Sequence, residues 1–301
     1  MRETRPSATA ALIAWATVVQ SRLPERAPLV PAGAAELCGW FVETLRPGSM
    51  RRIERSSVRR LRWELALVQV ASIPGIALHY LARKRFLEQA VRSAIQAGAR
   101  QVVVLGAGFD TLCLRLHREF LDVAFVECDH PATQAVKLIA LEGRGAAALN
   151  LSFVAADFTK VTLEQALGGL PGFARAEPTV MVAEGLTMYL TEAEVLRLFA
   201  FLAVRGGGGS RFAFTFLEPR ADGRLDFQKR SALVAPWLRL VGEPFVWGVR
   251  RGNLATLLAP AGFVPIEIAG AEELRLRYLR PLGLASCVLA EGEAMAVAQR
   301  T

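Results

Sequence analysis

The clearest pattern in the chain is a series of short apolar runs, separated by stretches in which apolar residues recur at helical spacing. The runs lie at Gln101–Leu105, Asp122–Glu127, Asn150–Ala155, Thr179–Ala183, Arg211–Leu217, Val264–Ile268 and Ala285–Ala290, and each has the length of a strand. The first run holds three successive valines, which predicts a strand buried on both faces. Strands that alternate with helices predict an α/β fold with a mostly parallel sheet.

The chain before the first strand carries helical patterns only. We expect residues 1–82 to form an N-terminal helical layer, and residues 83–301 a main domain with an insertion at about residues 218–250. The apolar stretch Ala8–Val19 follows two arginines, as in a signal peptide, but it is too short to span a membrane. It therefore predicts a packed helix. The irregular composition of the insertion predicts a lid over the ligand edge of the sheet.

A glycine turn follows the first predicted strand directly. Its residues Gly106, Ala107 and Gly108 leave the backbone unshielded, so that a ligand can lie against it. A helix is predicted to start at Asp110, where free N–H groups favour an anion. The second strand ends in acids, and Asp129 stands at the spacing usual for a ribose-binding acid. This succession is typical of the nucleoside-binding half of a doubly wound sheet.

The third position of the glycine pattern bears on the identity of the nucleoside. A dinucleotide turn has the form G-x-G-x-x-G, but Thr111 occupies the third glycine position here. S-adenosyl-L-methionine has no phosphates to cradle; its ribose diol suits a carboxylate, and its aminoacyl end suits backbone donors. A nicotinamide cofactor is the weaker alternative. The turn alone is also consistent with an ordinary loop between a strand and a helix.

Composition excludes several other classes of site. The 301 residues carry a formal net charge of +8, mostly from Arg, and helical spacing would place Arg51, Arg55 and Arg59 on one face. Because no nucleic-acid-binding signature accompanies this face, we interpret it as solvated and expect neither nucleic acid nor a membrane as a partner. The four Cys lack a C-x-x-C pair and the three His lack metal-ligand spacing. These features indicate no metal site and a reducing, cytoplasmic location.

Four motifs in order make the chain resemble a known family. They are Val104-Leu-Gly-Ala-Gly-Phe-Asp-Thr111, Glu127-Cys-Asp-His-Pro131, Ala156-Asp-Phe158 and Ala183-Glu-Gly-Leu-Thr-Met-Tyr-Leu190, with further likeness at Gly242–Gly248, Ala261–Phe263 and Arg277–Leu279. The chain resembles the class I S-adenosyl-L-methionine-dependent methyltransferases of the leucine carboxyl methyltransferase family, in the bacterial branch that includes polyketide carboxyl methyltransferases. The resemblance covers about residues 83–290. It implies a Rossmann-like, doubly wound seven-stranded sheet with strand order 3-2-1-4-5-7-6.

The resemblance also implies how individual residues bind the cofactor. Arg83 is similar to the arginine that pairs with the cofactor's carboxylate, a pairing that a planar guanidinium makes well. Glu184 would face the cofactor's ammonium, and Asp129 would accept both ribose hydroxyls. The other implied contacts are the turn residues Gly106, Ala107, Gly108 and Asp110, then Glu127 beneath Asp129, Asp157 at the adenine amino group, and Phe158 over the adenine ring.

The implied activity is that of an enzyme of secondary metabolism, a monomer or homodimer, which methylates a carboxylate of a small acidic metabolite to give a methyl ester. A basic net charge would steer such an anion toward the site. Tyr189 and His130 are the candidate catalytic residues, because an acceptor could reach Tyr189 and because a phenol would need His130 as a base. The alternatives are O-methylation of a phenol or hydroxyl of a natural product, and a non-catalytic cofactor-binding regulator.

Overall fold

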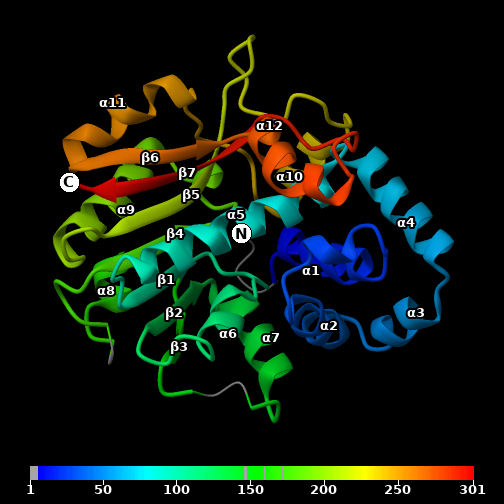
Figure 1. The fold of residues 1–301 in the computed structure, drawn as a ribbon, viewed down its shortest axis with the longest axis horizontal. Helices are drawn as coiled ribbons and strands as arrows, with labels where there is room; N and C mark the ends of the chain where they lie inside the picture. Colours follow the sequence, from blue (N-terminus) through cyan, green and yellow to red (C-terminus); the bar gives the residue numbers. More distant parts are fainter. Residues whose placement is uncertain (1–5, 146–147, 159, 171–172) are drawn as a thin grey trace.

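The chain is built around a seven-stranded sheet (Figure 1). The computed structural model describes residues 6–145, 148–158, 160–170 and 173–301. The strands are β1 Gln101–Leu105, β2 Ala124–Asp129, β3 Leu151–Ala155, β4 Thr179–Ala183, β5 Arg211–Leu217, β6 Phe263–Ala269 and β7 Glu293–Arg300. Their spatial order is β3-β2-β1-β4-β5-β7-β6, and only β7 runs antiparallel to its neighbours. The expected α/β fold and strand order are confirmed.

The helices are α1 Ala8–Ser21, α2 Ala34–Leu45, α3 Ser49–Arg55, α4 Val58–Ala71, α5 Ile76–Gln96, α6 Leu112–Leu116, α7 Pro131–Leu141, α8 Leu163–Leu167, α9 Glu192–Arg205, α10 Val234–Val241, α11 Leu254–Leu258 and α12 Ala271–Leu274, with a 3-10 turn η2 at Thr187–Tyr189. In Figure 1, α1 to α4 lie together beside the sheet, and α5 runs from them toward β1. A capping box begins α9, because Thr191 and Glu194 each accept the other's backbone N–H.

Apolar clusters cover both faces of the sheet. Val102 and Val104 of β1 belong to one cluster, together with residues of α1, α5 and α6. Val103 and Leu105 belong to another cluster, together with residues of α9 and α11. Because successive side chains of a strand point to opposite faces, a strand covered on both sides is apolar throughout. All of β1 is buried, as its sequence predicts.

The apolar stretch near the N-terminus forms the packed helix that was expected. Ala14, Val18 and Val19 of α1 are buried in the cluster that also covers β1. Among the described helices, none is by itself both long and apolar enough to cross a membrane. Within the described part of the chain, one pair of successive helices, α4 and α5, reaches that length and composition when taken together, and the bend between them is 93°.

The strand expected at Ala285–Ala290 is wrong. That segment is irregular, and the last strand is β7, Glu293–Arg300. The composition of β7, rich in Ala with Glu, Met, Gln and Arg, favours a helix. It is nevertheless a strand, because it fills the position between β5 and β6, bonds to both, and buries residues such as Met295 and Ala296 completely.

The arginine face expected from Arg51, Arg55 and Arg59 is also wrong, because the three residues do not share one helix. α3 ends at Arg55, and Ser57 caps the start of α4 by accepting a backbone N–H. Ser56 and Ser57 interrupt the helix because their hydroxyls offer the backbone local hydrogen bonds that compete with helical ones.

Gly75 determines where α5 begins. Its φ of +77° lies in the left-handed region, and a Cβ at this position would stand 2.4 Å from the backbone oxygen of Val288. A residue without a side chain therefore lets the segment before β7 pack against the start of α5. This contact matters for the site, because α5 carries Arg83 and Lys84.

We expect Gly75→Ala to lower the free energy of unfolding by about 3 kcal/mol, because strain of the left-handed backbone is added to a backbone clash. Gly48→Ala is the matched control, since Gly48 has a φ of +85° but nothing lies within 4 Å of the added Cβ. Its cost should be about 1 kcal/mol. Urea denaturation measures both values. Equal losses in the two variants would show that the contact with Val288 relaxes without cost.

Candidate active site

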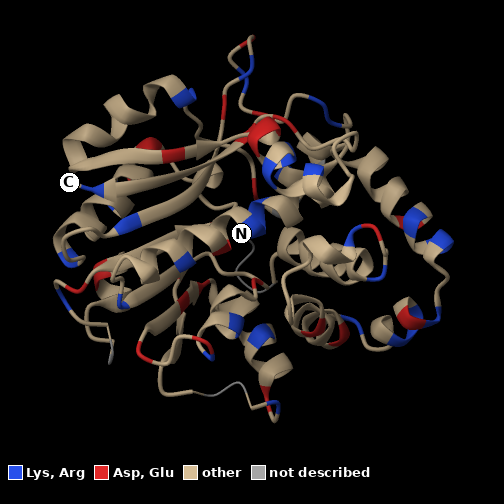
Figure 2. Cartoon of the chain, in the orientation of Figure 1, with Lys and Arg blue, Asp and Glu red and all other residues tan. Residues whose placement is uncertain are grey.

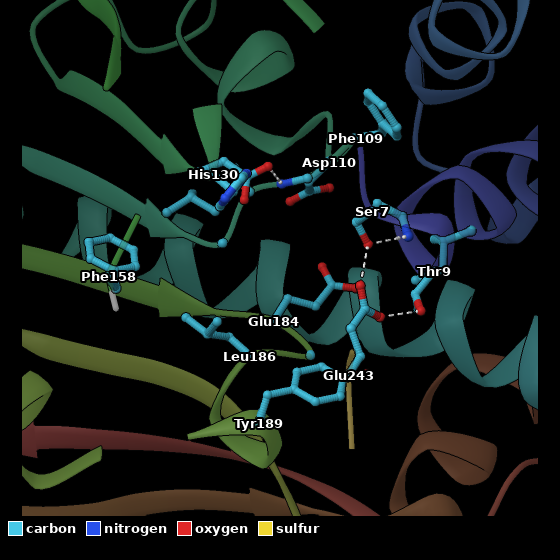
Figure 3. Close-up of a pocket in the computed structure, with 18 of the residues that line it drawn as sticks. Ser7, Thr9, Phe109, Asp110, His130, Phe158, Glu184, Leu186, Tyr189 and Glu243 are labelled. Atoms are coloured by element: carbon cyan, nitrogen blue, oxygen red, sulfur yellow. Dashed lines mark hydrogen bonds between the residues drawn. The ribbon is translucent and has the colours of Figure 1, made fainter. Parts of the chain in front are cut away.

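A cavity of about 270 Å³ lies at the carboxyl ends of the parallel strands β1 to β4, the usual place for a ligand in such a sheet. Residues of α1, α5 and the segment after β5 complete its walls. In Figure 3, His130 and Phe158 lie on one side of it, and Thr9 and Glu243 lie on another. Every site residue predicted from the sequence lines this cavity except Glu127.

The glycine turn after β1 forms part of the cavity wall and packs closely against neighbouring side chains. Gly106 and Gly108 have φ values of +62° and +51°, in the region that favours glycine. A Cβ on Gly106 would lie 3.1 Å from a methyl of Leu186, and one on Gly108 would lie 3.1 Å from Ala10. Neither position has room for a side chain, and both glycines line the cavity, so that no Cβ separates their backbone from a ligand there.

Asp129 is the last residue of β2, and its carboxylate faces the glycine turn. Its Oδ2 accepts the Gly108 N–H at 3.1 Å. Burial raises the pKa of Asp129 to about 6, although backbone N–H groups that bond the carboxylate oppose this rise. Asp129 is therefore a charged acceptor at neutral pH and a protonated acid below about pH 6.

Glu127 lies beneath the residues that line the cavity, and its predicted contact with the cofactor stays a prediction. It stands two residues before Asp129 on the same face of β2, and is therefore further from the carboxyl ends of the strands, where the cavity lies. Its Oε2 pairs with Lys137 Nζ at 2.5 Å, and both side chains are buried. Lys137 Nζ also donates to the backbone oxygen of Asp110 at 2.7 Å. Glu127 thus supports the loop that carries Asp110.

Buried charges join α5 to β4 and β7 under the cavity. Arg83 Nη1 donates to both carboxylate oxygens of Glu293, at 2.8 and 2.9 Å, and Arg83 Nη2 lies 2.8 Å from Glu184 Oε1. Burial lowers the pKa of Arg83, but the two carboxylates more than offset this, so the guanidinium remains charged. The Arg83 fork therefore binds two protein carboxylates, and its pairing with the cofactor's carboxylate stays a prediction.

Lys84 extends the same network toward the glycine turn. Its Nζ donates to Asp110 at 2.8 Å and to Glu184 at 3.1 Å. Burial raises the pKa of Asp110, but the Lys84 ammonium outweighs this and lowers it to about 2. Asp110 precedes α6, which begins at Leu112 instead of at Asp110, and its carboxylate accepts the Thr111 N–H at 2.7 Å.

His130 stands at the start of α7, beside the residues that follow β3. Its Nδ1 accepts the Ala132 N–H at 3.3 Å, so the ring proton is assigned to Nε2. That nitrogen lies 3.7 Å from Asp157 Oδ2, and Phe158 lines the same part of the cavity. In this tautomer Nε2 carries the proton and lies beyond hydrogen-bond length of Asp157, and the role of His130 as a base stays a prediction.

The sequence did not point to the polar residues that close the cavity. Ser7 Oγ and Thr9 Oγ1 donate to the carboxylate of Glu243, at 3.1 and 2.6 Å. Glu243 lies in the segment Gly242–Gly248, whose likeness to the bacterial branch was a signal, although no role was attached to it. Tyr80 and Lys84 also line the cavity, and their position on the helix of Arg83 was the available signal.

Residues 12–203 match the family model described as leucine carboxyl methyltransferase. The chain belongs to this family. One relative is the candidate S-adenosyl-L-methionine-dependent methyltransferase YktD of Bacillus subtilis, 30% identical over 224 residues, which are 74% of this chain and 71% of YktD. A candidate methyltransferase of Mycobacteroides abscessus with the same cofactor is 30% identical over 289 residues, which are 90% of this chain and 88% of the relative. The chain is an S-adenosyl-L-methionine-dependent methyltransferase.

The cavity of this leucine carboxyl methyltransferase family member has a donor set that fits the cofactor. The bare turn at Gly106 and Gly108 suits the aminoacyl part, and the buried carboxylate of Asp129 suits the ribose diol. Asp157 and Phe158 would hold the adenine. When bound, the cofactor supplies an electrophilic methyl group on a sulfonium. Acidic groups dominate the charged residues of the wall, which favours a cation there.

We expect Asp129→Ala to weaken cofactor binding by about 2 to 4 kcal/mol, because a charged acceptor for two hydroxyls is lost from a closed site. Calorimetry should also show wild-type affinity falling as the pH is lowered through about 6, where Asp129 takes up a proton. The affinity of Asp129→Ala should lack this dependence. Asp122→Ala removes an exposed carboxylate just before β2 and serves as the control. Unchanged affinity in Asp129→Ala would remove this residue from the cofactor site.

Arg83→Lys should lower cofactor affinity about tenfold, because a point charge cannot bridge Glu184 and Glu293 as a planar fork does. Arg85→Lys is the matched control, since Arg85 lies on the same helix outside the network. Calorimetry with both variants measures the difference. Wild-type affinity in Arg83→Lys would mean that the fork does not position the groups that bind the cofactor.

Proposed function

We propose that the methyl acceptor is a carboxylate oxygen of a small acidic metabolite and that the product is its methyl ester. The description of the matching family names a carboxyl methyltransferase, whereas the names of the two relatives specify the cofactor alone. The net charge of +8 draws anions toward the molecule as a whole, although acidic residues dominate the wall of the cavity itself.

The main support is a pair of phenol groups in the cavity wall. Tyr80 of α5 and Tyr189 of η2 both line the cavity, and neither hydroxyl has a hydrogen-bond partner among the described residues. Burial raises the pKa of Tyr80 to about 12 and that of Tyr189 well above its usual value. Both phenols are therefore neutral O–H donors at neutral pH. They can donate to a carboxylate, but they cannot take a proton from an acceptor.

A carboxylate acceptor needs no base, since it is already ionised above its reference pKa of about 4. This agrees with the state of His130, whose Nδ1 is engaged by the Ala132 N–H. The chemical step is an in-line displacement at the methyl carbon. The protein accelerates it by orienting the acceptor oxygen and by excluding water from the cavity.

Glu243 favours a second candidate, methylation of a hydroxyl group such as a phenol. Glu243 lines the cavity with 7% of its surface exposed, and the two residues that donate hydrogen bonds to it, Ser7 and Thr9, are uncharged. A carboxylate in this position could take the proton of a hydroxyl acceptor. It would also repel an anionic acceptor.

With a carboxylate acceptor and saturating cofactor, the rate should be independent of pH between about 6 and 8, because the acceptor is ionised throughout. Glu243→Gln should retain or raise this rate, since it removes a like charge. The product should be cleaved by mild alkali. Release of S-adenosylhomocysteine and mass spectrometry of the product before and after alkali measure these outcomes.

Glu194→Gln is the matched control, because Glu194 also lines the cavity but its carboxylate serves the α9 cap. Hydroxyl methylation would give an ether that resists alkali. If Glu243 takes the proton of the hydroxyl, activity is lost in Glu243→Gln. If the hydroxyl instead ionises without a base, the rate climbs about tenfold per pH unit in the same window. Loss of activity in His130→Ala in place of Glu243→Gln would assign the base to His130.

A further inference from the structure

A smaller cavity of about 80 Å³ adjoins the one that holds the cofactor-binding residues. Its walls come from α1, α4, α5, η2 and the segment after β5. We call it the apolar chamber; the residues that characterise it are Leu65, Val68, Ile73, Val234, Leu238 and Phe245. None of these six lines the larger cavity.

The two cavities share part of their walls. Thr9, Tyr80 and Tyr189 line both of them. The ring of Tyr189 stacks on Phe245, with 5.8 Å between centroids, and Phe245 belongs to the apolar chamber alone. An acceptor that is bound beside the two phenols would therefore leave the rest of its carbon skeleton at the mouth of the apolar chamber.

The chemistry of the two cavities differs sharply. Asp129, Glu184 and Glu243 line the first cavity, whereas the described lining of the apolar chamber includes no charged residue. The end of α4 that forms one wall carries neither Lys, Arg, Asp nor Glu (Figure 2). The Ser72 hydroxyl in the wall already donates to the Val68 carbonyl. Away from the wall that it shares with the first cavity, the chamber therefore offers a charged group no oppositely charged partner in exchange for its hydration.

We propose that the apolar chamber binds a short hydrocarbon tail of the methyl acceptor, so that the substrate is an amphiphile with its reacting group at one end. The identity of the reacting group rests on the proposed function, but the tail does not. The chamber has about half the volume of an apolar protein cavity, about 150 Å³, that admits benzene. It therefore suits an aliphatic segment of a few carbons better than a ring.

Calorimetry on the full chain loaded with S-adenosylhomocysteine tests the tail directly. The titrants are straight-chain alkanoates from acetate to octanoate and, in a second series, the n-alkanols of the same lengths. Affinity should rise about fourfold with each added methylene until the apolar chamber is full, and then level off. The rise should be parallel in the two series, because the head group stays outside the chamber.

Val68→Phe fills the apolar chamber and should end the rise at a shorter chain. Val70→Phe is the matched control, because it makes the same change two residues further along α4, where the side chain is 76% exposed. Its series should follow that of the wild type. Leu238→Ala enlarges the chamber and should extend the rise to longer chains, which keeps the test decisive if Val68→Phe does not fold. Thermal unfolding and affinity for S-adenosylhomocysteine establish that each variant is intact.

Three outcomes would overturn the tail assignment. They are an affinity that is independent of chain length in both series, no binding by any alkanoate or alkanol, and the same dependence on chain length in Val68→Phe as in the wild type. Failure of the proposed function has a different signature. Alkanoates that bind with the expected length dependence but yield no methyl ester with S-adenosyl-L-methionine would contradict the carboxylate acceptor and leave the tail assigned. Esters formed from all alkanoates with equal kcat/KM would overturn the tail and leave the function.

Discussion

The charges buried around Arg83 are the constraint on which the site depends. One guanidinium binds Glu184 at the end of β4 and Glu293 at the start of β7, and the neighbouring Lys84 binds Glu184 and Asp110. Each of these groups loses most of its hydration, and only the opposite charges beside it offset that loss. Removal of one member would leave a buried charge without compensation, which is more costly than the absence of the whole network. The cavity floor is therefore held in one arrangement.

The parts of the fold that could be predicted are those in which local pattern and tertiary surroundings agree. Gln101–Leu105 has the valines that a strand buried on two faces requires, and Pro131 suits the first turn of α7. The expected bounds of the strand Gln101–Leu105 are those observed. The strand Glu293–Arg300 was not predicted, because its residues favour a helix. It is a strand because it pairs with both β5 and β6.

Some residues of the site could likewise be predicted from the sequence, and others could not. The spacing from the glycine turn predicted Asp129, and the family resemblance implied Asp157 and Glu184; all three line the cavity, because the carboxyl ends of parallel strands meet at one edge of a sheet. Glu243 and Glu293 could not be predicted, since nothing in their local sequence indicates where the chain returns after the insertion. Glu127 lies deeper than Asp129, because a spacing of two residues along a strand preserves the face of the sheet but not the distance from the carboxyl ends of the strands.

The hydrogen bonds from Ser7 and Thr9 to Glu243 join segments that a ribosome makes at very different times. Ser7 and Glu243 are 236 residues apart, which corresponds to roughly 10 to 50 seconds of synthesis at about 5 to 20 residues per second. Glu293, the partner of Arg83, is likewise synthesised 210 residues after it. A nascent chain can form the glycine turn and present the ribose acid long before either partner exists. Until the last strand is made, it has a place for the cofactor but no enclosed space in which methyl transfer could begin.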